Sequence, residues 1–336
     1  MTSNTVIAIV GTEMSGKTLL ASLLMNLPHQ EYTPTTSAAR HSFNEKITLL
    51  DVPGNSKYNK TLCASLTEAD ACILCVSPDT SDRTLELLII LQTFQIPCLC
   101  CVTPLEVSEE RIRKLFTQAG FTFIPRLIGR DKLTEVPELF KFPIKRDVNP
   151  GPLVAAIVAV SQCPEGLLVK LTIHTGAFLE SSSELFLHPG GVAVKVLKVA
   201  SVAGRHLEVI FSGEDRRLIS KGMILADSPD ISSKQFKAEI VIIGRPPNGI
   251  KSGFVGVVNW LNMQTPMKIE IESKIDKTTG YDLKSQDEPH CLHAGDHAKI
   301  TLTSQGPSIP LFGRFLIRND NVVIAAGYVG NHTNFS

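Results

Sequence analysis

The sequence lacks a net charge, and this absence excludes the simplest electrostatic functions. Its 33 lysine and arginine residues balance 33 aspartate and glutamate residues, so the formal net charge at pH 7 is zero. Such a chain has no overall basic field to attract nucleic acid or an anionic membrane surface. Any contact with RNA must therefore come from local basic patches, and we expect neither DNA nor a membrane as a partner.

The amino terminus also lacks a basic leader, because a strand-like run begins almost at once. We therefore expect no signal peptide and a cytoplasmic location. The uncharged residues 87–105 have the length of a membrane span, but two glutamines and Pro97 divide them into a helix end, a turn and a buried strand. Cys72 and Cys75 would alternate along a strand and point to opposite faces. We interpret the eight cysteines as free thiols rather than zinc ligands.

The most informative motif follows an apolar run at residues 6–10. It has the form Gly-x-x-x-x-Gly-Lys-Thr and precedes a segment with leucines at helical spacing. In such a P-loop, backbone N–H groups surround a phosphate, the lysine reaches the β- and γ-oxygens, and the threonine hydroxyl can ligate Mg²⁺. The start of the following helix strengthens the anion site. The predicted phosphate-binding residues are Gly11, Thr12, Glu13, Met14, Ser15, Gly16, Lys17 and Thr18.

A second motif indicates that the nucleotide site is a switch. The strand-like residues 47–50 lead into Asp-Val-Pro-Gly at residues 51–54. In P-loop proteins, an acidic residue at the tip of a neighbouring strand holds Mg²⁺. A glycine just beyond it can donate its N–H to the γ-phosphate. We predict that Asp51 contacts the metal and that order in the loop at Gly54 depends on that phosphate.

The pattern of elements changes near residue 163. Before it, helical and strand-like segments alternate, which is typical of a parallel α/β sheet. The predicted elements here are helices at residues 58–69, 83–94, 108–120 and 153–160, and strands at 71–76 and 97–102. After it, short strands joined by turns indicate barrels or sandwiches. Pro229 and the polar residues 230–234 look like the seam between two β domains.

These segments resemble the translational GTPases related to elongation factor Tu, elongation factor 1-alpha and the selenocysteine-specific elongation factor. Residues 51–60 are similar to the family's DCPGH segment, and residues 69–76 to the strand that follows it. Residues 207–226 are similar to the end of its first barrel, and residues 310–329 to its closing hairpin. The resemblance covers nearly the whole chain.

The resemblance implies an α/β P-loop GTPase domain at residues 1–163, followed by two all-β barrel domains at 164–230 and 231–336. It also implies GTP or GDP and Mg²⁺ as cofactors, aminoacyl-tRNA and the ribosome as partners, and a monomer. Thr33, Thr35 and Thr36 are candidates for the first switch's hydroxyl on Mg²⁺, and we choose Thr36. The candidate contacts to tRNA phosphates are Arg205, His206, Arg216, Arg217, Arg314 and Arg318.

The chain departs from the family pattern at its catalytic and base-reading positions. Asn55 stands where the family has a histidine, and an amide can bind a water molecule but cannot offer a protonated imidazole. The NKxD motif aligns with Thr103-Pro104-Leu105-Glu106, so a proline replaces the lysine that covers the base. The base-supporting segment, which we align with residues 143–145, is also altered.

From these positions we predict Asn55 as the catalytic position, Thr103 and Glu106 as base contacts, and slow or effector-dependent GTP hydrolysis. Two alternatives stay open. One is a catalytically degenerate paralogue that acts as a tRNA- or protein-binding scaffold. The other is a P-loop protein with relaxed nucleotide specificity, because loss of NKxD removes the guanine filter and leaves the phosphate site intact.

Overall fold

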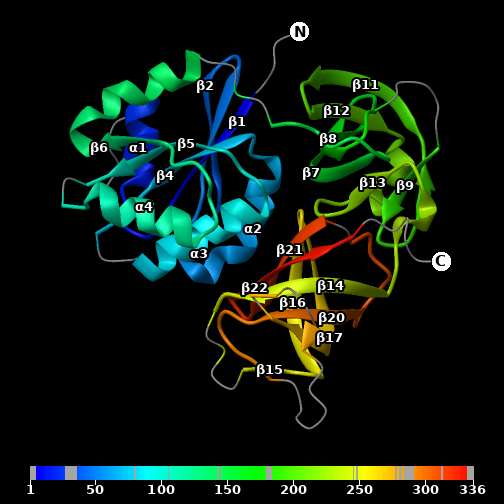
Figure 1. Ribbon diagram of the computed structural model, residues 1–336. Coiled ribbons are helices and arrows are strands. Elements are labelled where there is room, and N and C mark those ends of the chain that lie inside the picture. Colours follow the sequence, from blue (N-terminus) through cyan, green and yellow to red (C-terminus); the bar gives the residue numbers. More distant parts are fainter. Residues whose placement is uncertain are drawn as a thin grey trace. The chain divides into compact units, whose positions relative to one another are not determined.

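The protein is described by a computed structural model. The described residues are 5–26, 36–78, 81–104, 106–141, 144, 146–178, 184–244, 246, 249–276, 278–279, 282–283, 291–311 and 313–330. The chain divides into two compact units (Figure 1). The α/β unit comprises Met1–Val148 and Val202–His206, and the β unit comprises Asn149–Ser201 and Leu207–Ser336.

A six-stranded sheet forms the centre of the α/β unit, in the order β2-β3-β1-β4-β5-β6. Its strands are β1 (Thr5–Gly11), β2 (Ala39–Asn44), β3 (Ile47–Asp51), β4 (Ala71–Cys75), β5 (Cys98–Thr103) and β6 (Arg126–Gly129). All neighbouring pairs are parallel except β2 with β3. Since the carboxyl ends of the parallel strands share one edge, the loops that follow them gather there, where open α/β sheets bind ligands.

Helices cover both faces of this sheet (Figure 1). The helical segments are α1 (Lys17–Leu24), η1 (Ser56–Tyr58), α2 (Asn59–Glu68), α3 (Ser81–Thr93), α4 (Glu109–Gln118) and η2 (Arg130–Lys141). The segments α1 and η2 pack against one face of the sheet, in a core that includes Ile7, Ile9 and Val136. The Ser108 hydroxyl caps α4 by accepting a hydrogen bond from the Arg111 N–H, as the sequence predicts.

The β unit contains two seven-stranded sheets, in the orders β10-β9-β13-β7-β8-β12-β11 and β16-β21-β22-β14-β20-β17-β18. The strands of the first are β7 (Val154–Cys163), β8 (Gly166–Thr175), β9 (Leu185–His188), β10 (Val192–Val194), β11 (Val196–Ala203), β12 (His206–Phe211) and β13 (Ile224–Ala226). Those of the second are β14 (Gln235–Ile242), β16 (Phe254–Trp260), β17 (Met263–Ile275), β18 (Asp282–Leu283), β20 (His297–Ser304), β21 (Gly313–Asn319) and β22 (Val322–Val329). Pairing of β16 with β17 closes the second sheet into a barrel.

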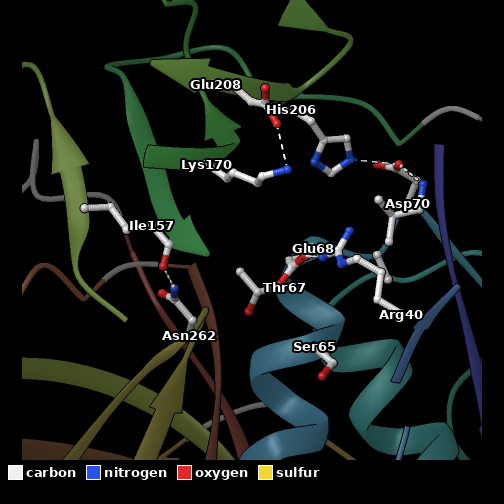
Figure 2. Close-up of polar contacts among 12 residues, drawn as sticks. Arg40, Ser65, Thr67, Glu68, Asp70, Ile157, Lys170, His206, Glu208 and Asn262 are labelled. Atoms are coloured by element: carbon white, nitrogen blue, oxygen red, sulfur yellow. Dashed lines mark hydrogen bonds and ion pairs between the residues drawn. The ribbon is translucent and has the colours of Figure 1, made fainter. Parts of the chain in front are cut away.

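Smaller elements complete the β unit. They are β15 (Ile250–Lys251), which pairs with β19 (Cys291–Leu292), and the short helices η3 (Gly213–Arg217) and η4 (Pro229–Ile231). The side-chain amide of Asn262 donates to the Ile157 carbonyl at 2.8 Å, within this unit (Figure 2). Alternating inward residues of the two sheets share one apolar core, which includes Ala156, Phe236 and Trp260.

One predicted helix is wrong. In place of the helix predicted at residues 153–160, residues 154–160 form most of strand β7, which pairs with β8 and β13. The segment is a continuous apolar run, and such a run fits a buried strand as well as a buried helix. The segment becomes a strand because a neighbouring strand pairs with it on each side. This pairing satisfies the backbone polar groups that burial removes from water.

The uncharged residues 87–105 behave as predicted. They form the end of α3, a turn in which Gln95 has a φ of 54°, and strand β5. Within the described residues, none of the helices combines the length and apolar character needed to cross a bilayer. The eight cysteines are free thiols, and burial raises the pKa of the Cys75 thiol to about 12.

Candidate functional site

The loop between β1 and α1 has the backbone geometry of an anion cradle. Met14 and Gly16 have φ values of 56° and 87°, which turn the chain so that successive N–H groups can converge. Gly11 has no room for a side chain, because a Cβ atom there would lie 2.2 Å from the Cys75 carbonyl oxygen. The Ser15 hydroxyl is buried and has no hydrogen-bond partner among the described residues.

Lys17 is held inside this loop. Its Nζ donates to the Thr12 carbonyl at 2.6 Å, and the residue is only 6 % exposed. Burial lowers the pKa of the ammonium, and the nearby charge of Asp51 partly counters this effect. A bound phosphate would offer this buried cation a stronger acceptor than the neutral carbonyl.

The structure brings together two predicted metal ligands. The Thr18 hydroxyl donates to Asp51 Oδ2 at 2.7 Å, and Asp51 is 2 % exposed at the end of β3. These hard oxygen donors fit Mg²⁺, which is usually held by one or two protein oxygens together with phosphate and water. Thr36 is exposed, and none of the contacts described for the chain joins its hydroxyl to this pair. Thr33 and Thr35 lie outside the described residues.

The segment after Asp51 packs directly on the P-loop. A Cβ atom on Gly54 would lie 2.6 Å from the Gly11 carbonyl oxygen and 2.7 Å from Lys17 Nζ, so only glycine fits. The Gly54 carbonyl accepts from Arg83 Nε at 3.1 Å. The loop at Gly54 is therefore in contact with the same lysine that is predicted to bind phosphate.

Asn55 joins the two loops through its side chain. Its amide nitrogen donates to Glu13 Oε1 at 2.9 Å, and its amide oxygen accepts from the Lys57 N–H. The second contact caps η1. Asn55 thus lies beside the P-loop.

The predicted base contacts lie at the end of β5. Thr103 is the last residue of the strand and is 8 % exposed, whereas Glu106 is exposed beyond it. The neighbouring strand β6 was not predicted, and it places Gly129 opposite Thr103. Arg130, the next residue, donates to the Ser15 carbonyl at 2.9 Å. The predicted base-supporting segment, residues 143–145, lies largely outside the described residues, of which only 144 is described.

Arg205 and His206 are engaged in an internal cluster rather than free for tRNA. His206 Nε2 contacts Asp70 Oδ2 at 2.9 Å (Figure 2). Arg205 Nε donates to the other carboxylate oxygen, Asp70 Oδ1, at 2.6 Å. Arg205 is 6 % exposed and also donates to the Glu68 and Ala69 carbonyls. As a phosphate contact, the prediction of Arg205 is therefore wrong.

The other basic candidates differ in exposure. Arg318 is buried and donates to Asn259 Oδ1 at 2.7 Å, so it too is a structural residue. Arg216, Arg217 and Arg314 are exposed. These three are the candidates that keep a surface position suited to a phosphate.

Comparisons with known proteins agree with this architecture. Residues 235–330 match the family described as GTP-eEF1A C-terminal domain-like. The chain is 24% identical over 337 residues to elongation factor 1-alpha of Methanococcus vannielii, covering 84% of this chain and 78% of the relative.

The fold is similar to that of translation elongation factor SelB from Methanococcus maripaludis in complex with the GTP analogue GppNHp. The TM-score is 0.67 at 16% identity, covering 98% of this chain and 79% of the other. A bacterial selenocysteine-specific elongation factor, EF-Sec, gives a TM-score of 0.63 at 17% identity, covering 98% of this chain and 58% of the other.

The fold is the one seen in these solved elongation factors, in which an α/β domain precedes β-rich domains. Over most of its length the chain is similar in sequence to elongation factor 1-alpha, and its residues 235–330 match the C-terminal domain model of that group. The predicted resemblance and the predicted fold class are confirmed.

Proposed function

We propose that this protein is a translation factor that binds Mg·GTP and uses the γ-phosphate as a switch. The observation that carries the proposal is the packing of Gly54 against Lys17 Nζ and the Gly11 carbonyl. A phosphate bound by Lys17 must displace that contact, so nucleotide binding and the position of the loop at Gly54 are coupled. Thr18 and Asp51 would hold Mg²⁺, which would neutralise phosphate charge.

Titration of nucleotide-stripped protein with labelled GTP, GDP and ATP, with and without Mg²⁺, tests this proposal. We expect Mg²⁺-dependent binding of GTP, because Thr18 and Asp51 contribute to affinity only through the metal. Binding of none of the three nucleotides would refute the proposal. Equal affinity for ATP and GTP would instead favour a P-loop protein with relaxed nucleotide specificity. Pro104, which stands in place of the base-covering lysine, is the observation that favours this alternative.

We expect intrinsic hydrolysis at the slow rate of unstimulated switch GTPases, and a faster rate in Asn55→His. An imidazole can act as a general base or carry positive charge, so the gain should reach about 100-fold, the lower end for a positioned acid–base group. Single-turnover assays with ribosomes present measure the effect. Asn55→Gln, which keeps the amide, should remain slow. An Asn55→His variant no faster than Asn55→Gln would place the catalytic group elsewhere and favour the scaffold alternative.

We further propose that the GTP-bound protein binds tRNA through exposed arginines. Replacing Arg216 and Arg217 together by alanine should reduce the slope of log affinity against log salt by about 1.5, because each phosphate contact contributes about 0.7–0.9. Filter binding over a salt series measures this, with Arg113→Ala on α4 as the control. Binding should be tighter with a non-hydrolysable triphosphate than with GDP. Equal binding in both states would contradict the switch.

A further inference from the structure

Arg130 ties the P-loop to the neighbouring strand ends. It follows β6 directly, and its Nη2 donates to the Ser15 carbonyl at 2.9 Å and to the Val76 carbonyl at 3.4 Å. Val76 comes just after β4, which is separated from β6 by β5. The side chain therefore spans the carboxyl edge of the sheet above the end of β5.

The guanidinium of Arg130 turns its flat face toward the start of α1. A Cβ atom placed on Gly16 would lie 3.8 Å from Nη2, 3.9 Å from Cζ and 4.0 Å from Nε. Nearly equal distances to three atoms of a planar group mean that Gly16 covers one face of the plane, so a base could stack only on the opposite face. Arg130 is nevertheless exposed, and the two acceptors named above are neutral carbonyls. Among the residues that the structure describes, no carboxylate forms an ion pair with its guanidinium.

The position beside Arg130 on β5 cannot supply such a cation. Thr103 ends the strand opposite Gly129, and Pro104 follows it with neither charge nor N–H. A nucleotide whose phosphates lie in the P-loop must extend its base along this same edge of the sheet. Arg130 is thus a planar cation between the phosphate cradle and the ends of β5 and β6.

We infer that Arg130 provides the surface on which the purine of a bound nucleotide stacks, in the place left without a cation by Pro104. The inference rests on the proposed nucleotide-binding function and names a specificity-determining residue for it. Guanidinium groups stack on aromatic rings and gain cation–π attraction. Stacking involves the face of the ring, so Arg130 favours purines in general. Glu106 can then distinguish guanine from adenine by accepting hydrogen bonds from the edge of the base.

The test compares a ligand that has a base with one that has only phosphates. Nucleotide-stripped full-length protein is titrated calorimetrically with Mg·GDP and with inorganic tripolyphosphate. Arg130→Ala should bind GDP about tenfold more weakly, whereas its affinity for tripolyphosphate should change by less than about twofold. Arg130→Lys, which keeps the charge without the plane, should show an intermediate loss. Arg126→Ala is the matched control, because Arg126 begins β6, the strand that Arg130 follows, and pairs with Glu135.

Two results would overturn the inference while nucleotide binding itself stands. One is an equal loss of affinity for GDP and tripolyphosphate, which would show that Arg130 only supports the P-loop. The other is unchanged GDP affinity in Arg130→Ala. If that variant does not fold, as judged by circular dichroism, Arg130→Lys gives the same comparison. Failure of the wild type to bind either ligand would instead refute the proposed function, and this inference with it.

Discussion

Replacement of Lys17 by alanine is expected to weaken binding of Mg·GTP by about ten- to a hundredfold. A charge-assisted hydrogen bond contributes about 1.5–3 kcal/mol, which corresponds to that loss of affinity. Lys17 Nζ is already buried in the loop, 2.6 Å from the Thr12 carbonyl, so a bound phosphate meets a prepositioned cation. Equilibrium titration with a fluorescent GTP analogue measures the effect.

Lys114→Ala is the matched control for this variant. Lys114 is an exposed lysine of α4 in the same α/β unit, and its removal should leave the affinity unchanged. If Lys17→Ala binds Mg·GTP as tightly as Lys114→Ala, the loop is only a structural turn. Loss of affinity for GTP together with normal circular dichroism would assign the effect to the missing contact.

The sequence predicts the fold well where local patterns and packing agree. The strand β1, the cap at Ser108 and the turn at Gln95 have strong local signals, and the structure contains all three. The prediction from sequence fails at β7, because a continuous apolar run has no hydrophobic period that separates a strand from a helix. The strand β6 is missed for a related reason. Its four residues are too few to show alternation, and its identity depends on pairing with β5.

The candidate site shows the same division between local motif and distant contact. The pairing of Thr18 with Asp51 follows from two adjacent parallel strands, so motif spacing can predict it. The contact of Asn55 with Glu13 depends on rotamers in two loops, which no spacing encodes. The interaction of Arg130 with Ser15 joins residues 115 positions apart and depends on the unpredicted β6. Arg205 was misjudged because sequence alone does not reveal that a charged residue is buried.

The substitution Asp70→Asn is expected to destabilise the α/β unit by about 3–5 kcal/mol, the usual cost of removing one partner of a buried ion pair. The side chain of Asp70 is 8 % exposed and accepts hydrogen bonds from the Val6 N–H, Arg205 and His206. Asparagine keeps the shape but removes the carboxylate that the buried guanidinium of Arg205 contacts. Burial, and then the positive charge of Arg205, lower the pKa of the Arg146 guanidinium to about 9. Arg146 is therefore a second buried cation that loses a favourable charge when Asp70 is replaced.

This effect should depend on pH in a defined direction. Burial tends to raise the pKa of Asp70, but the hydrogen bond from His206 and then the charges of His206 and Arg205 outweigh it and lower the pKa from 3.8 to about 2. A carboxyl with a lowered pKa stabilises the fold fully above about pH 3.8, and it loses that effect as the pH falls through about 2. Lowering the pKa from 3.8 to about 2 corresponds to about 2 kcal/mol of pH-dependent stability.

Urea unfolding of wild type, Asp70→Asn and Asp147→Asn separates this contribution from general effects of lost charge. Far-ultraviolet circular dichroism follows helices α1–α4, which belong to the α/β unit, whereas fluorescence of the single tryptophan, Trp260, follows the β unit. We expect the dichroism midpoint of Asp70→Asn to fall at pH 7 and to approach that of the wild type below about pH 3. The exposed Asp147 should be silent at both pH values. A dichroism midpoint for Asp70→Asn equal to that of Asp147→Asn would mean that solvent or backbone relaxation compensates Arg205, and that the Asp70 cluster does not stabilise the unit.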